Sequence, residues 1–159
     1  MAAKHKIVPQ IPVTRVTTVN LGKLDGTVQP DAFSDKDVGK IVKLIGADTY
    51  GLAAVGDAIE GIIVSVETAT SNGFKVGGIK SDEKAFVTAD GLQATPGTGT
   101  IAVGDYVLTG TVSAVGTALT NYPKVVKATS QTPTPFAWRV VGFFTGTGAV
   151  GQTLVIERV

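Results

Sequence analysis

A short pattern recurs three times in this chain and constrains its fold more than any other feature. The copies are Ala54-Val55-Gly56-Asp57, Ala102-Val103-Gly104-Asp105 and Ala149-Val150-Gly151-Gln152, spaced 48 and 47 residues apart, and each precedes a β-prone segment. Glycine followed by a short polar residue is typical of a tight turn, because glycine accepts a positive φ and Asp bonds nearby backbone donors. The pattern therefore predicts a turn that leads into a strand, used three times.

Thr-, Val- and Gly-rich segments without sustained helical periodicity predict an all-β chain. Strands are expected at residues 12–19, 38–45, 59–67, 84–88, 101–103, 106–109, 111–115, 122–128, 136–144 and 152–159, with a hairpin at Asn72-Gly73. Within 59–67, the alternation puts Ile62, Val64 and Val66 on one face. Three repeats are too few to close a propeller, so we expect a single β-sandwich or barrel-like domain.

The two ends of the chain are the expected contact regions. Pro9 and Pro12 predict an extended N-terminal arm over residues 1–20, ahead of a β-rich domain over residues 21–159. The last two strands carry apolar residues on both faces, which is typical either of the middle of a sandwich or of a strand under a neighbouring subunit. The interface candidates are Ile7, Val8, Ile11, Val13, Phe136, Trp138, Phe143 and Phe144.

Charged residues make up only 17% of the chain, against about 25% in average soluble proteins, and mean hydropathy is +0.28. Either self-association or packing on a larger assembly covers part of the surface, or threonine hydroxyls keep it solvated. A net charge of +1 favours neither nucleic acid nor an anionic membrane as partner, and no apolar run is long enough to span a bilayer. Without cysteine there is no disulfide or thiolate chemistry, and the N-terminus does not resemble a signal peptide.

Each pattern that could indicate a chemical site has a simpler interpretation. Gly146 to Gly151 spells G-x-G-x-x-G, but a strand-like segment follows it where a nucleotide site needs a helix. His5, the only histidine, lies in the arm, so a Ser-His-Asp triad has no positioned base.

Acidic and aromatic residues give no stronger signal. Asp31, Asp35 and Asp37 lack the glycine and closing glutamate of a calcium loop and are interpreted as turn and capping carboxylates. Asp57 and Asp105 are explained by the repeated turn without catalysis. Trp138 and Arg139, beside several phenylalanines, are typical of a core rather than of a sugar-stacking platform. We expect no enzyme activity, no cofactor, no metal and no small-molecule substrate.

The chain resembles the capsid decoration, or cement, proteins of tailed bacteriophages. The resemblance rests on three segments, Asp37–Leu44, Val55–Ile62 and Ala102–Val107, and on the C-terminal stretches Ala137–Gly142, Gly148–Gly151 and Ile156–Val159. It implies a non-enzymatic virion protein, made in the host cytoplasm, that binds the outer surface of the head as a homotrimer and stabilises the shell of major capsid protein. Two alternatives remain: another virion β-module, such as a head fibre base, tail or baseplate part, and a carbohydrate-binding β domain with an exposed Trp138.

Overall fold

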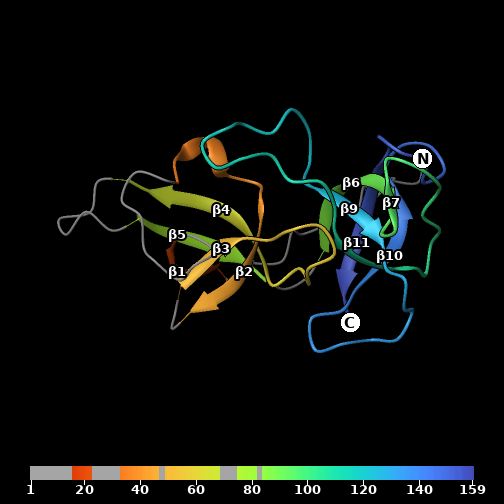
Figure 1. Cartoon of the computed structure of the whole chain (residues 1–159), viewed down its shortest axis with the longest axis horizontal. Helices are drawn as coiled ribbons and strands as arrows, with labels where there is room; N and C mark the ends of the chain where they lie inside the picture. Colours follow the sequence, from red (N-terminus) through yellow and green to blue (C-terminus); the bar gives the residue numbers. More distant parts are fainter. Residues whose placement is uncertain (1–15, 23–32, 47–48, 69–74, 82–83) are drawn as a thin grey trace, which may run out of the picture.

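The computed structural model describes residues 16–22, 33–46, 49–68, 75–81 and 84–159, and their regular structure is β apart from one short 3₁₀ turn, η1 (Asp35–Asp37). Two small barrels lie side by side, one in the first half of the chain and one in the second (Figure 1). The all-β, barrel-like prediction is confirmed. Residues 1–15 of the predicted arm lie outside the described residues, and residues 16–20 form most of the first strand.

The N-terminal barrel closes five strands in the order β1-β3-β2-β4-β5. They are β1 (Val16–Leu21), β2 (Ile41–Gly46), β3 (Thr49–Leu52), β4 (Gly61–Glu67) and β5 (Lys75–Lys80). The β1–β3 pair is parallel and all other pairs are antiparallel. Its interior is filled by a small apolar cluster of Val19, Leu21, Phe33, Val42, Ile63 and Ile79.

The C-terminal barrel uses β6 (Lys84–Leu92), β8 (Tyr106–Thr109), β9 (Lys124–Lys127), β10 (Trp138–Phe143) and β11 (Thr153–Arg158). The sheet runs β11-β10-β8-β9-β6, and β11 also pairs with β6, which closes the ring. A two-residue strand, β7 (Thr95–Pro96), extends it beyond β6. Here too a single pair, β6–β9, is parallel among the five ring strands.

The two barrels are structural duplicates of one another. Strands β1, β2, β3, β4 and β5 correspond in order to β6, β8, β9, β10 and β11, and every pairing and its direction is reproduced. The register agrees as well: Val42 lies opposite Leu52 and Gly61, as Val107 lies opposite Lys127 and Trp138. Even the irregularity is shared, between Ile63 and Ser65 in β4 and between Val140 and Gly142 in β10. Residues matched by this register are called equivalent below.

The three predicted turns share one geometry. In each, the fourth residue donates its N–H to the carbonyl of the alanine, and Gly56, Gly104 and Gly151 have φ of 85°, 94° and 85°. In each turn the glycine N–H donates to the carbonyl of one residue in another strand, and the N–H of that residue donates to the carbonyl of the fourth residue of the turn. The partner is Thr109 for the first turn, Val140 for the second and Ala89 for the third. Each turn is therefore fastened to a strand distant in sequence.

A fourth copy of this arrangement precedes β2 at Asp37-Val38-Gly39-Lys40. Gly39 has φ of 91° and donates to Ile63 O, and Ile63 donates back to Lys40 O. Because Ile63 is equivalent to Val140, this turn and Ala102–Asp105 are the pair related by the duplication. The spacing near 48 residues is thus not the repeat of the fold.

Several strand predictions need correction. Residues 101–103 and 111–115 are not strands, since the chain there forms turns and loops, and Val38–Lys40 is a turn rather than the start of β2. β3 was not predicted, because Gly51 interrupts its apolar pattern; a Cβ there would lie 2.8 Å from Ile45 Cδ1. In β4 the bulge breaks the expected alternation, so Ile63 and Val66 face the same apolar cluster and Val64 is exposed. The Asn72-Gly73 hairpin turn lies outside the described residues.

The barrels share a core through the segment between β3 and β4. Ile59 and Ile62 pack in one apolar cluster with Val107, Trp138 and Leu154 of the C-terminal barrel. Trp138 is fully buried and its Nε1 donates to Ile59 O at 2.8 Å. Gly56 N donates to Thr109 O, and Thr109 N donates to Asp57 O. The first predicted turn therefore joins the two barrels.

Candidate functional site: an exposed aromatic patch

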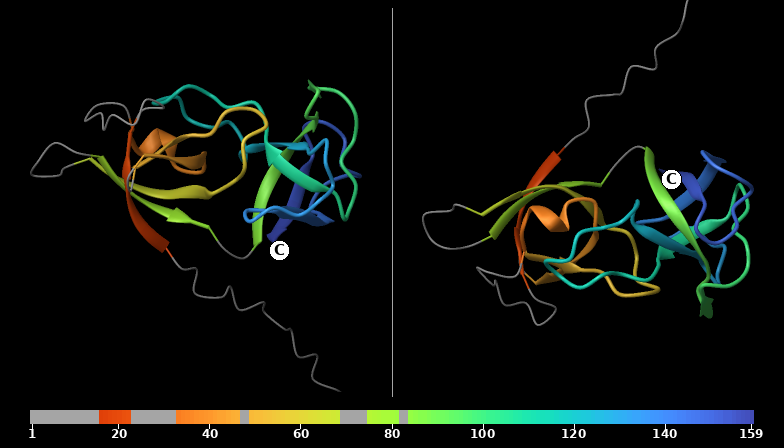
Figure 2. Two further views of the ribbon diagram at one scale, coloured as in Figure 1. Left: turned by 60° about the horizontal axis from the view of Figure 1, so that its bottom comes forward. Right: turned by 90° about the horizontal axis from the view of Figure 1, so that it is seen from above.

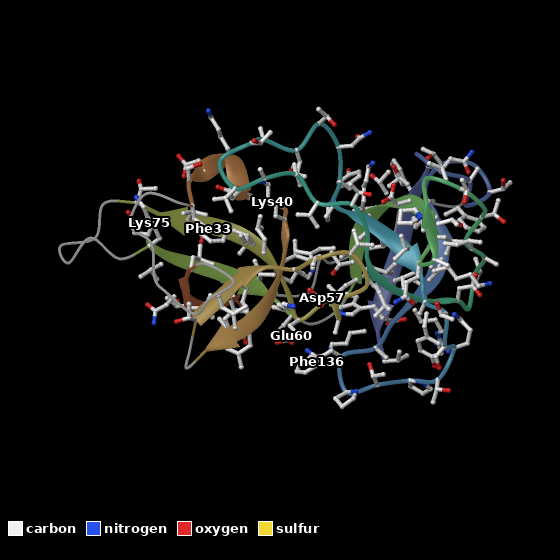
Figure 3. All side chains as sticks on the ribbon, in the orientation of Figure 1. Phe33, Lys40, Asp57, Glu60, Lys75 and Phe136 are labelled. Atoms are coloured by element: carbon white, nitrogen blue, oxygen red, sulfur yellow. The ribbon has the colours of Figure 1, made fainter. Side chains whose placement is uncertain are left out.

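The predicted interface residues are distributed between surface and core. Ile7, Val8, Ile11 and Val13 lie outside the described residues. Trp138 has no exposed surface, so its prediction as an interface residue is wrong for this chain; the position is part of the shared core. Phe136, Phe143 and Phe144 are exposed. Phe136 packs under the guanidinium of Arg158, 5.0 Å from its ring centre, on the lower side of the C-terminal barrel (Figure 3).

Phe144 belongs to a cluster of three exposed aromatic residues that we call the aromatic patch: Phe86, Tyr122 and Phe144. The ring centres of Phe86 and Phe144 are 5.3 Å apart in an edge-on arrangement, and those of Phe86 and Tyr122 are 5.5 Å apart. Their exposed fractions are 44%, 43% and 66% for Phe86, Tyr122 and Phe144. Aromatic pairs at these separations attract each other, but a large part of each ring's surface still faces solvent here.

Three different elements hold the patch together. Phe86 points outward from β6, between the inward-facing Ala85 and Val87. Phe144 follows the bulge in β10 and is fixed by its N–H bond to Thr153 O. Tyr122 is held by its carbonyl, which accepts a bond from the Thr88 hydroxyl at 3.0 Å. Phe86 thus lies in the sheet, and Phe144 and Tyr122 lie next to strands and are hydrogen-bonded to it.

The duplication supplies an internal control for this surface. The position equivalent to Phe86 is Thr18 in β1, and the position equivalent to Phe144 is Glu67 at the end of β4. Both are exposed, as their counterparts are. A barrel of the same strand order and register therefore forms with polar residues at these two places.

A buried polar cluster at Asp37 and Lys40 attaches a long loop of the C-terminal barrel to the N-terminal barrel. Lys40 Nζ lies 2.6 Å from Asp37 Oδ1, and both side chains are fully buried. Lys40 also donates to Ala114 O at 2.6 Å, and Gly116 N donates to Asp37 Oδ1 at 2.8 Å. The loop over residues 110–123 crosses to η1 at this point (Figure 1). Ala114-Val115-Gly116 is another Ala-Val-Gly turn, and Gly116 also has a positive φ, so the sequence already carried a signal for this site.

Asp90 anchors the start of the same loop. Its carboxylate accepts bonds from Thr111 N and Thr111 Oγ1 at 2.7 and 2.6 Å, and Lys124 Nζ lies 3.3 Å away. Burial raises the pKa of Asp90, but the Thr111 hydrogen bonds and the Lys124 charge outweigh it, so the pKa lies below its ordinary value. A cavity of about 10 Å³ between Lys40, Thr111 and Lys124 has room for no more than one water molecule.

The other predicted carboxylates have structural roles. Asp57 and Asp105 each accept the N–H of the alanine that opens their own turn, at 2.6 and 2.8 Å, and pair with Lys43 and Lys127. Asp37 caps η1 by accepting Ser34 N, as expected for a capping carboxylate. Gly146, Gly148 and Gly151 lie in turns ahead of β11. Asp31 and His5 lie outside the described residues, and within those residues no three His, Cys, Asp or Glu side chains are grouped for a metal.

The described part of the chain contains no helix long and apolar enough to cross a membrane. Comparisons with protein-family models, with curated proteins and with solved structures found no match.

Proposed function

We propose that this protein is a capsid decoration protein of a tailed bacteriophage: a non-enzymatic component, acting as a homotrimer, that binds the outer surface of the head and stabilises the shell of major capsid protein. Three features support the proposal: the resemblance in sequence, the low fraction of charged residues, and a rigid β scaffold that presents apolar side chains to a partner. Many equivalent contacts on one shell give strong total attachment even when each contact is weak.

The observation that carries the proposal is the aromatic patch. Three clustered, exposed aromatic rings are typical of a surface that binds another protein, because aromatic residues contribute much of the binding energy at protein interfaces. The equivalent surface of the N-terminal barrel has Thr18 and Glu67 instead, so folding does not account for the rings.

The test is co-sedimentation of the purified protein with heads of its own phage that lack it. We expect the protein to sediment with expanded heads, and the variant Phe86→Thr/Phe144→Glu to lose most of this binding. The matched control is Val103→Thr, which removes an exposed apolar side chain elsewhere on the same barrel. Absence of binding to heads, together with heads that remain equally stable without the protein, would exclude the proposal.

Mass analysis of separated heads and tails distinguishes decoration from a role in the tail or baseplate, since the protein then appears in the tail fraction. The carbohydrate-binding alternative depended on an exposed Trp138, and Trp138 is buried. We therefore retain no specific observation in its favour.

A further inference from the structure

The aromatic patch has a chemical counterpart within the same chain. Residues 7–12 read Ile-Val-Pro-Gln-Ile-Pro, so Pro9 and Pro12 form a P-x-x-P spacing flanked by branched aliphatic residues. Segments of this kind favour the extended polyproline conformation, which loses little entropy on docking, and proteins bind them with clustered exposed aromatic rings. Phe86, Tyr122 and Phe144 form such a cluster.

The place where this segment joins the barrels brings it within reach of the patch. Val16, the first residue of β1, is paired with Lys80, the last residue of β5. Lys80 Nζ donates to Lys84 O at 2.9 Å, and Lys84 begins β6, two residues before Phe86. The starts of β1 and β6 lie toward the same side of the molecule in both views of Figure 2.

The segment is long enough to span the distance between Val16 and Phe86. From the strand pairing and the chain between Lys80 and Phe86, Phe86 lies within about 26 Å of Val16. Seven residues in the polyproline conformation, from Val16 back to Pro9, span about 22 Å, and nine residues, back to Ile7, span about 28 Å. A segment of this length can therefore reach the patch.

We propose that residues 7–12 of each chain dock onto the aromatic patch of the same chain, with Pro9 and Pro12 packed against Phe86, Tyr122 and Phe144. Attachment at Val16 makes the binding intramolecular and holds the segment at high effective concentration, so a modest intrinsic affinity is enough. The docked segment covers the patch in the free protein, so a head that binds the patch has to displace it. This inference concerns the isolated chain and does not depend on the proposed role in a phage head.

The absence of cysteine allows a direct test on the full-length protein. A nitroxide spin label attached to Gln10→Cys is expected to weaken the NMR signals of the Phe86 and Phe144 amides and to leave that of Glu67, the position equivalent to Phe144, unaffected. The Phe86→Thr/Phe144→Glu variant places the residues of the N-terminal barrel in the C-terminal one, and we expect it to abolish the selective loss of signal. Pro9→Ala/Pro12→Ala is expected to reduce it, and Val103→Thr to leave it unchanged.

Two results would overturn the proposal. One is a loss of signal that is the same in the Phe86→Thr/Phe144→Glu variant as in the parent. The other is a loss that appears only when spin-labelled unenriched protein is mixed with isotope-enriched protein lacking the label, since this would place the segment on a different molecule. Chemical shifts of the core amides confirm that each variant is folded.

Discussion

The two barrels have the same strand order, register and bulge, and several core positions hold Val or Ile in both, yet at other core positions the large and small residues differ. In the N-terminal barrel Leu21 packs over Gly77, whereas the equivalent pair in the C-terminal barrel is Ala89 and Leu154. Gly61 is likewise equivalent to Trp138. Between the Leu21–Gly77 pair and the Ala89–Leu154 pair, the large and the small residue have exchanged places, while the strand order and register are the same. The comparison teaches that strand pairing defines this barrel and that the total volume of its core can be supplied from either side.

The outer surfaces differ for another reason. A core position has to be filled by an apolar side chain, whereas an exposed position accepts either a polar or an apolar one. Core packing therefore does not explain why one barrel exposes Phe86 and Phe144 where the other has Thr18 and Glu67. The N-terminal barrel in turn has the buried Asp37–Lys40 pair, whereas its equivalent turn has Ala102 and Asp105. One barrel is specialised to hold a loop, the other to present aromatic rings.

The largest expected effect comes from a substitution in the core that the two barrels share. Trp138→Ala removes a fully buried ring and leaves Ile59 O without its donor, so we expect the free energy of unfolding to fall by about 3–5 kcal/mol, measured by urea denaturation. The control is Phe136→Ala, two residues earlier, which loses an exposed ring and its contact with Arg158, at a cost of about 1 kcal/mol. Equal losses in both variants would contradict the assignment of Trp138 to the core.

The second prediction concerns the specialised turn of the N-terminal barrel. Lys40→Met leaves the Asp37 carboxylate buried without its cation, and we expect a loss of about 3–5 kcal/mol. Asp37→Leu/Lys40→Met removes both charges, and its loss in urea denaturation should be smaller than that of Lys40→Met alone, because no buried charge remains. A double variant less stable than the single one would show that Asp37 acts mainly through Ser34 and Gly116.

The sequence allowed the β class and the turns to be predicted because both depend on local chemistry. In the repeated pattern the glycine is followed by Asp or Gln, which is typical of a turn, and Gly56, Gly104 and Gly151 all adopt a positive φ. The duplication was not predicted, because the Val and Ile residues shared by equivalent positions are common to all β-strands, and other equivalent positions, such as Gly61 and Trp138, share no side-chain property. Strand register depends on pairing between distant segments, which a local pattern does not contain.

The candidate site was predicted only in part, for a similar reason. Phe144 was identified from the apolar C-terminal strand, but Phe86 and Tyr122 come from segments far away in sequence and meet it only in the closed barrel. Trp138 was misassigned because alternation along a strand does not say which face turns inward, and the bulge after Val140 changes that face within the strand.

The third prediction concerns substitutions that make the core of the N-terminal barrel more like that of the C-terminal barrel. Gly77→Ala adds a Cβ that would lie 2.7 Å from Leu21 Cδ1, so we expect a loss of about 1–3 kcal/mol from overpacking. Leu21→Ala makes room for it, as Ala89 does for Leu154, so the two substitutions should be less than additive in thermal or urea unfolding. Strict additivity would mean that the two residues do not share the space that the equivalence assigns to them.

The smallest expected effect is a dependence of stability on pH that Asp90 of the C-terminal barrel provides. Asp90 is equivalent to Gly22, so the N-terminal barrel has no carboxylate there. Because the pKa of Asp90 is lowered in the folded protein, its ionised form stabilises the fold above the unfolded pKa of about 3.9, and this contribution disappears as pH falls through the folded pKa. Asp90→Asn should cost about 1–2 kcal/mol near neutral pH, and its stability difference from the parent should shrink below about pH 4. Thr111→Val, which removes only the hydroxyl donor at 2.6 Å, should reduce the same dependence in part. A difference that stays constant down to acid pH would show that the loop is held by packing rather than by the ionised Asp90.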